Sequence, residues 1–340
     1  MKGLWKSSIQ TESGRRRFAA SLVALAVLCA LASLCLGPVN LSPLDTVSAL
    51  LGRGNGTLRQ IVLLARLPRT CGCLLAGAAL AVAGAVIQGV MDNPLAAPNV
   101  IGVNSGAGLA VALCCALAPT AVTLVPFAAF LGALAGVLLV LFIAQKAGAA
   151  RITLVLAGVA ISSIFSACID AVVTLVPDAL NGYSDFRIGG MKNLYMARIA
   201  PAFWVIIIVL PIILFLAGDL DLLRLGTEQA QSLGLPAKSR RIILLTLAAA
   251  LSGAAVSFAG LLGFVGLIVP HILRRLLGEE SFPLLLSCAF GGAAFLTVCD
   301  LLARLLFAPY ELPVGIVLAL AGGPFFIWLL LRQRGGRRYD

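Results

Sequence analysis

Charged residues are scarce in this chain of 340 residues. Only 11% of the residues are charged, whereas 61% are hydrophobic and the mean hydropathy is +1.06. A soluble domain carries about 25% charged residues. This apolar surface is too large for one core to hide, so the sequence predicts a protein that resides in lipid.

Histidine is nearly absent, and the cysteines lack metal-binding spacing. His271 is the single histidine, and the nine cysteines include no C-x-x-C pair. A zinc constellation cannot be assembled from such a set. We interpret the cysteines as small side chains packed between helices, and we expect neither a metal site nor a catalytic residue.

A phosphate-binding loop is also lacking. No G-x-x-x-x-G-K-[ST] motif occurs, so the chain cannot hold ATP by that route, and we expect no cofactor on it. The net charge is +11, but the basic residues lie at the ends of apolar runs and form no stripe. This distribution argues against nucleic-acid binding.

Long apolar runs are what the sequence has in abundance. A run of about 17 to 25 residues crosses a hydrocarbon layer of roughly 30 Å. We predict an all-α polytopic membrane protein with ten transmembrane helices, one of them short. The predicted spans are about 18–36, 70–90, 100–118, 122–145, 152–176, 200–217, 242–259, a short eighth span within 260–275, 283–306 and 313–331.

The basic residues orient these spans. Ten spans place both termini on one side, which then receives 17 Lys and Arg against 8 on the other. Because cytoplasmic loops carry the excess of basic residues, we expect both termini in the cytoplasm. The predicted domains are a cytoplasmic tail (1–17), a transmembrane domain (18–331) and a cytoplasmic basic tail (332–340).

Three arginines run against this orientation signal. Arg66, Arg69 and Arg304 lie at the outer ends of spans. They either snorkel to the interface or meet carboxylates of an external partner. Arg304 also follows Asp300 by four residues, which predicts a local ion pair. Asp170, near the outer end of the fifth span, is an intramembrane acid and therefore a functional candidate.

Two long polar segments interrupt the apolar runs, at 177–198 and 219–241. In the second, Asp219 or Asp221 is predicted to cap one short helix and Thr227 another. Gly234 suits a helix end, and Pro236 suits the start of the next helix. This series of helix caps and helix ends predicts two short cytoplasmic helices at which a partner docks.

Small residues also predict close helix packing. Gly102 and Gly106 have GxxxG spacing, as do Gly132 and Gly136. Such pairs let two helix backbones approach each other.

Seven motifs are distributed along the chain after residue 60. They are RLPR at 66–69, GAALAVAGAVIQGVMDNPLAAPNVIGVNSGA at 77–107, LAGVAIS at 156–162, LGLPAKSRR at 233–241, GLLGFVGLIVPHILR at 260–274, DLLARL at 300–305 and ELPVGIVLALAGGPFFIWLLLR at 311–332. In these motifs the chain resembles the FecCD family of ABC-importer permeases, which includes vitamin B12, haem and ferric-siderophore permeases.

This resemblance implies a fold and a set of partners. The fold is the type II ABC importer permease fold, in which two permease subunits, identical or paralogous, surround a central path in the cytoplasmic membrane. Two cytoplasmic ABC ATPases would hold ATP and Mg, and a periplasmic or lipid-anchored binding protein would deliver the cargo. A ferric siderophore is the expected cargo, ahead of haem, cobalamin and an oxyanion.

The resemblance also assigns residues. Spans five and ten are expected to line the path. One departure is that the Trp-x-x-Gly-(Gly/Ser) element of many members reads Phe186-Arg-Ile-Gly-Gly190 here. The implied residues are Arg66, Arg69 and Arg304 for docking of the binding protein; Thr227, Glu228, Ala230, Leu233, Gly234, Leu235 and Arg240 for coupling to the ATPase; Asn93 and Leu95 for the cytoplasmic constriction; and Ala150 and Arg151 for a second gate, without the hydroxyl residues of some relatives.

Two other classes of function remain open at this point. A secondary transporter driven by an ion gradient needs titratable groups near the bilayer midplane, and the sequence offers almost none. A structural membrane subunit without cargo would not need the two short helices predicted in the 219–241 segment.

Overall fold

The computed structural model describes residues 11–334 except 40, 54–55, 149–150 and 309. Every regular element in these residues is a helix, which confirms the predicted all-α class. The first half contains α2 (Glu12–Cys35), α3 (Pro43–Leu50), α4 (Gly56–Gln60), the π-helix η1 (Ile61–Arg66), α5 (Leu67–Met91), η2 (Pro98–Ile101), α6 (Val103–Leu117), η3 (Val122–Leu124), α7 (Val125–Lys146) and α8 (Arg151–Leu175). The second half contains α9 (Ala179–Ile188), α10 (Met196–Phe215), α11 (Ala217–Arg224), α12 (Thr227–Ser232), α13 (Ala237–Ala259), α14 (Val265–Leu277), α15 (Ser281–Leu305) and α16 (Val314–Arg334).

Seven stretches are long and apolar enough to cross a membrane. They contain α2, α5, α7, α8, α10, α13 and α15. The other three predicted spans coincide with the helices α6, α14 and α16. A helix therefore occupies each of the ten predicted runs.

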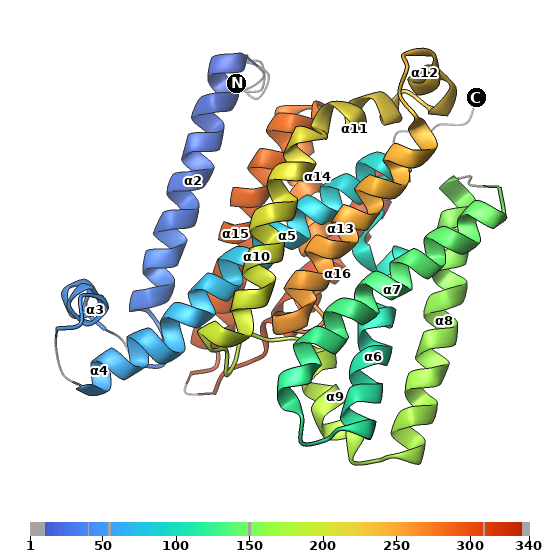
Figure 1. Cartoon of the computed structure of the whole chain (residues 1–340). Helices are drawn as coiled ribbons and strands as arrows, with labels where there is room; N and C mark the ends of the chain where they lie inside the picture. Colours follow the sequence, from blue (N-terminus) through green and yellow to red (C-terminus); the bar gives the residue numbers. More distant parts are fainter. Residues whose placement is uncertain (1–10, 40, 54–55, 149–150, 309, 335–340) are drawn as a thin grey trace.

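The helices form a bundle with two distinct ends (Figure 1). The start of α2 and the short helix α12 lie at the upper end, whereas α3, α4 and α9 lie at the lower end. The outward faces of α2 and α10 are apolar, with exposed side chains such as Leu28 (63%) and Ile208 (57%). Such faces suit contact with lipid chains.

α5 is the central helix of the bundle. It packs against α13, α14 and α15, and almost all of its residues after Gly72 are buried. A Cβ atom added to Gly77 would lie 2.2 Å from the carbonyl oxygen of Gly292, and one added to Gly84 would lie 2.0 Å from that of Gly266. Only glycine permits backbone contacts this close.

The predicted GxxxG contact lies between α6 and α7. A Cβ atom on Gly106 would lie 2.3 Å from the carbonyl oxygen of Gly132, and one on Gly136 would lie 2.7 Å from that of Gly102. The prediction of close packing at these pairs is confirmed.

Helices also form outside the predicted spans. Residues 37–69 contain α3, α4 and η1, and the polar stretch 177–198 contains α9. α3 forms because Ser42 caps it, its hydroxyl accepting from the Asp45 amide at 3.1 Å, with Pro43 in the first turn. α2 starts at Glu12, inside the predicted tail, because the Thr11 hydroxyl accepts from the Gly14 amide at 3.1 Å.

Candidate functional site

A buried ion cluster lies at the C-terminal end of α15. Asp300 is completely buried, and its carboxylate accepts three hydrogen bonds of 3.0 to 3.1 Å from Nε and Nη2 of Arg69. The Nε atom of Arg304 lies 3.1 Å from the same carboxylate. The predicted pair Asp300–Arg304 is therefore present, but Arg69, which donates three hydrogen bonds to Asp300, was not predicted as a partner.

Arg69 bridges two carboxylates. Its Nη1 donates to Glu311 at 2.6 Å, so one guanidinium joins α5, α15 and the segment before α16. Arg69 lies 231 residues from Asp300 and 242 from Glu311. No local pattern marks pairs at such separations.

Arg66 and Arg304 cap the C-terminal end of α2. Arg66 Nη1 donates to the carbonyl oxygens of Leu34 and Cys35, both at 2.7 Å. Arg304 donates to the Ser33 hydroxyl at 2.7 Å and contacts the Leu36 carbonyl at 3.3 Å. The last carbonyls of a helix have no partner within it and carry partial negative charge, so two cations stabilise this helix end.

The three predicted docking arginines are thus brought together, and their guanidinium groups point to acceptors within the chain. Arg66 and Arg304 are only 6% and 2% exposed, so neither snorkels to water. Arg69 is slightly more accessible, with 11% of its side chain exposed. Docking at these residues stays a prediction.

At the opposite end of α15, the segment 217–236 folds back onto the bundle. The Asp221 carboxylate accepts from the amide of Ser281 at 3.0 Å and from its hydroxyl at 2.6 Å, so it caps the first turn of α15. The prediction that Asp219 or Asp221 caps a short helix is wrong, because α11 begins earlier, at Ala217. Asp219 instead pairs with Arg240 at 3.2 Å.

α12 also begins differently from the prediction. Thr227 is its first helical residue and not its cap, which is Gly226. The Thr227 hydroxyl accepts from Arg241 at 3.1 Å. The helix ends as predicted, because Gly234 has φ +84° and the Leu235 amide donates to the Ala230 carbonyl at 3.0 Å. Pro236 directly precedes α13, also as predicted.

The predicted coupling residues divide by exposure. Glu228, Leu233 and Gly234 are exposed, Leu233 by 61%. Ala230 and Leu235 are buried beneath them, where they hold the short helix against the bundle. Glu228, Leu233 and Gly234 are therefore the predicted coupling residues that are accessible to a partner.

α15 separates these two regions by the thickness of a membrane. It has 25 residues, which corresponds to about 37 Å at about 1.5 Å per residue. Asp221 contacts its first residue, and Arg69 contacts Asp300 near its last turn. Since a hydrocarbon layer is roughly 30 Å thick, the arginine cluster and the short helices belong to opposite faces.

The predicted constriction after α5 is a tight turn. Asp92 has φ +48°, and the side-chain oxygen of Asn93 accepts from the Leu95 amide at 2.9 Å. Asn93 is exposed and Leu95 half-buried. Of the predicted second gate, Ala150 lies outside the described residues, and Arg151 is described only as the start of α8.

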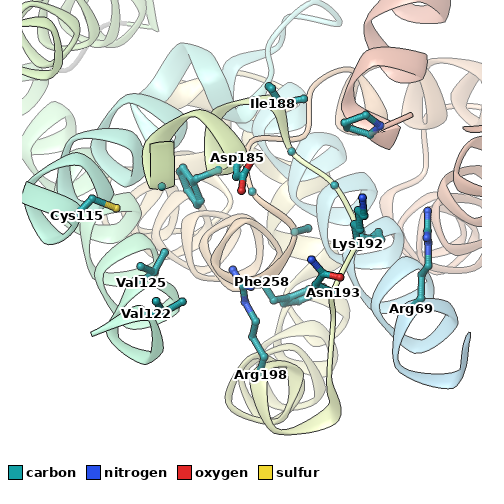
Figure 2. Close-up of a pocket in the computed structure, with 18 of the residues that line it drawn as sticks. Arg69, Cys115, Val122, Val125, Asp185, Ile188, Lys192, Asn193, Arg198 and Phe258 are labelled. Atoms are coloured by element: carbon teal, nitrogen blue, oxygen red, sulfur yellow. The ribbon is translucent and has the colours of Figure 1, made fainter. Parts of the chain in front are cut away.

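A cavity of about 450 Å³ opens beside the arginine cluster. Figure 2 shows Val122 and Val125 on its left side and Lys192 and Arg69 on its right. The Gly189–Gly190 backbone forms part of its wall, where the Gly190 amide donates to the Ala259 carbonyl at 2.8 Å. Charged groups of both signs, including Asp185 and Arg198, line this cavity.

Comparisons with known proteins agree with this architecture. The chain is 38% identical over 326 residues to the Fe(3+)-citrate import system permease protein YfmE of Bacillus subtilis (strain 168), covering 94% of this chain and 97% of that protein. It is 37% identical over 334 residues to the hemin transport system permease protein HmuU of Yersinia pestis, covering 93% and 96%.

A solved structure shares the fold as well. It is an inward-facing conformation of a chain assigned to the metal-chelate type of ABC transporter, with 28% identity and a TM-score of 0.84 over 93% of this chain and 99% of that one. The sequence profile of the FecCD transport family matches residues 25–332. The chain therefore belongs to the FecCD transport family and has the fold of a type II ABC importer permease.

Proposed function

We propose that this chain is the permease subunit of an ABC importer that carries a metal chelate across the cytoplasmic membrane. The observation that carries this proposal is the placement of the arginine cluster and the α11–α12 segment at opposite ends of one membrane-length helix, α15. Relatives named for ferric citrate, haem and vitamin B12 support a chelate as cargo. Among these classes we propose a ferric siderophore; haem, cobalamin and an oxyanion are the alternatives.

The partners follow from this role. A second permease, identical or paralogous, completes the path, and two cytoplasmic ABC ATPases bind ATP and Mg and supply the energy. A periplasmic or lipid-anchored binding protein delivers the chelate to the outer face. The permease is itself non-catalytic, and both of its termini lie in the cytoplasm.

The coupling surface is α12 together with the turn that follows it. Glu228 and Leu233 contact the ATPase. The buried Ala230 and Leu235 anchor α12 to the bundle, so that α12 moves together with the helices beneath it. Movement of α12 reaches α15 through the Asp221–Ser281 contact. A rigid-body displacement of this kind changes which side of the path is open.

The outer surface is the cluster of Arg66, Arg69 and Arg304. Carboxylates of the binding protein meet this cluster, because a guanidinium group forms two-pronged bonds with a carboxylate. Arg69 is the primary contact, since its side chain is the most exposed of the three and its partner Glu311 is also accessible. The Asn93–Leu95 turn, with Ala150 and Arg151, forms the cytoplasmic gate.

The test is uptake by the reconstituted transporter. The chain is placed in proteoliposomes with its ATPase and binding protein, and chelate uptake is measured with ATP, without ATP and with a protonophore. ATP-dependent uptake that resists the protonophore supports the proposal. Uptake that the protonophore abolishes without ATP would instead identify a secondary transporter, and no uptake under any condition would favour a structural subunit.

A further inference from the structure

One exposed face of α8 is polar although the helix is apolar enough to span a membrane. Ser163, Ser166 and Asp170 follow one another at intervals of three and four residues, and all three are exposed. These intervals place them on one side of the helix. A carboxylate in hydrocarbon costs about 2.5 to 3.5 kcal/mol on insertion scales, so this face meets water or protein and not lipid.

Two cavities continue this polar face. One, of about 630 Å³, is lined by Asn99 and by Ser163, Ser166 and Asp170 of α8. The other, of about 560 Å³, is lined by Asn99, Asn104, Ser184 and Arg187 and bordered by α16. Asn99 lines both cavities, so they are neighbours, and we call their polar lining residues together with those of α8 the polar face.

Arg187 is the single cation in the linings of these two cavities. It is exposed in the last turn of α9, a position where a helix end favours positive charge. Within the described part of the chain no carboxylate lies within 4 Å of its guanidinium group, Asp170 included. Its donors are therefore available to a ligand.

The two charges of the polar face, Arg187 and Asp170, both affect the pKa of Tyr183. Burial raises the pKa of its phenol, Arg187 opposes this shift, and Asp170 adds to it. Both charges therefore act on the same hydroxyl, although they form no pair with each other.

The cavity that Arg187 lines also contains an aromatic ring in its wall. Phe264 lines the cavity in a left-handed conformation with φ +65°. A Cβ atom on Gly322 would lie 2.1 Å from the Phe264 ring, so α16 holds the ring in place. A lining that combines a cation, an aromatic ring, two amides and a hydroxyl suits an organic ligand that carries negative charge.

We propose that Arg187 determines specificity along the path by binding the anionic oxygens of a negatively charged chelate. This inference rests on the proposed function and refines its cargo class. A charge-assisted hydrogen bond favours an anionic chelate over a neutral chelate of similar size, because only the anionic one engages the guanidinium fork. The substitution of Arg187 thus alters preference among chelates and not the capacity to transport.

The experiment measures equilibrium binding to the purified permease–ATPase complex. The probes are ferric citrate, which is anionic, and a neutral ferric hydroxamate chelate. R187Q is expected to weaken ferric citrate binding by about tenfold, as the loss of one charge-assisted hydrogen bond predicts, and to leave hydroxamate binding unchanged. R187K should fall between R187Q and the wild type.

The matched control is R53Q, which removes one exposed charge outside the polar face. The proposal is overturned if R187Q weakens both probes equally, if R187Q binds ferric citrate as the wild type does, or if the wild type binds the neutral probe as tightly as the anionic one or binds neither. The proposed function fails separately, if the wild-type complex shows no ATP-dependent uptake of any chelate.

Discussion

The guanidinium group of Arg69 donates three hydrogen bonds of 3.0 to 3.1 Å to the carboxylate of Asp300. Asp300 has no exposed surface, and the side chain of its second cationic neighbour, Arg304, is 3% exposed. The pair joins the central helix α5 to α15. Because buried charges are stable only when paired, this contact fixes how the two helices meet.

Removing the charge of Asp300 should destabilise the protein strongly. D300N leaves Arg69 and Arg304 buried with one carboxylate fewer, and the loss of one partner of a buried pair costs about 3 to 5 kcal/mol. We expect a large fall in the melting temperature of the detergent-solubilised protein. D178N, at an exposed acid, is the control and should leave the melting temperature nearly unchanged. A D300N protein as stable as D178N would show that the cluster does not hold the helices together.

Adding a side chain between α5 and α15 should separate these helices. In G77V the added Cβ atom would lie only 2.2 Å from the carbonyl oxygen of Gly292, so the two backbones must move apart. We expect poor yield of folded protein and a lower melting temperature. G218A, in the helix α11 with open space around the glycine, should be neutral or stabilising by up to about 1 kcal/mol. Equal behaviour of the two variants would contradict this account of the packing.

Breaking the Asp221–Ser281 contact should uncouple ATP hydrolysis from uptake. In the reconstituted transporter, D221A should keep most of its ATPase activity but move severalfold fewer chelates per ATP, because the alanine leaves no side-chain oxygen on α11 to accept from the start of α15. S281A removes only one of the two bonds and should have a smaller effect. If the contact is the link, the double variant is no worse than D221A, whereas additive losses would mean that the two residues act independently.

Freeing Arg69 from its accessible internal partner should strengthen docking. E311Q removes the carboxylate 2.6 Å from Arg69 Nη1, and Glu311 is the more exposed of its two acidic partners. If Arg69 receives a carboxylate of the binding protein, affinity should rise by up to about fivefold, the equivalent of a partly exposed pair of about 1 kcal/mol. The affinity is measured by titrating binding protein onto the proteoliposomes. Unchanged affinity would argue against Arg69 as a docking residue.

Cysteine labelling should place α3 and α12 in different compartments. Cys168 is exposed and five other cysteines are half-buried, so the background for labelling is the variant in which alanine replaces Cys29, Cys35, Cys71, Cys114, Cys115 and Cys168. In this background, L44C on α3 should react with an impermeant maleimide from outside intact cells. S232C on α12 should react only after the membrane is opened. Labelling of both sites from one side would remove the proposed topology.

Much of the fold follows from local patterns in the sequence. Apolar runs predict helices because length and hydropathy suffice to define a span, and all ten predicted runs are helical. The glycine pairs of α6 and α7 and the end of α12 at Gly234 were also correct, since each depends on spacing or on one residue type. The helices in the polar segments were not predicted, because α3 and α9 are short and lack the long periodic pattern that identifies a helix.

The arginine cluster shows why the site was only partly predictable. The sequence marked Arg66, Arg69 and Arg304 as unusual by charge and position but gave no partner for the first two. Their acceptors lie on α2, α15 and the segment before α16, and chain separation conceals such contacts. Asp221 was misassigned for the same reason, because the helix it caps begins 60 residues later.

The cap that Arg304 places on α2 has a consequence for biosynthesis. Ser33 and Arg304 are separated by 271 residues. At a translation rate of about 5 to 20 residues per second, the interval between them is roughly 14 to 54 seconds. Until Arg304 has been synthesised, the C-terminal end of α2 lacks this cation, so the cap forms only after most of the chain has been made.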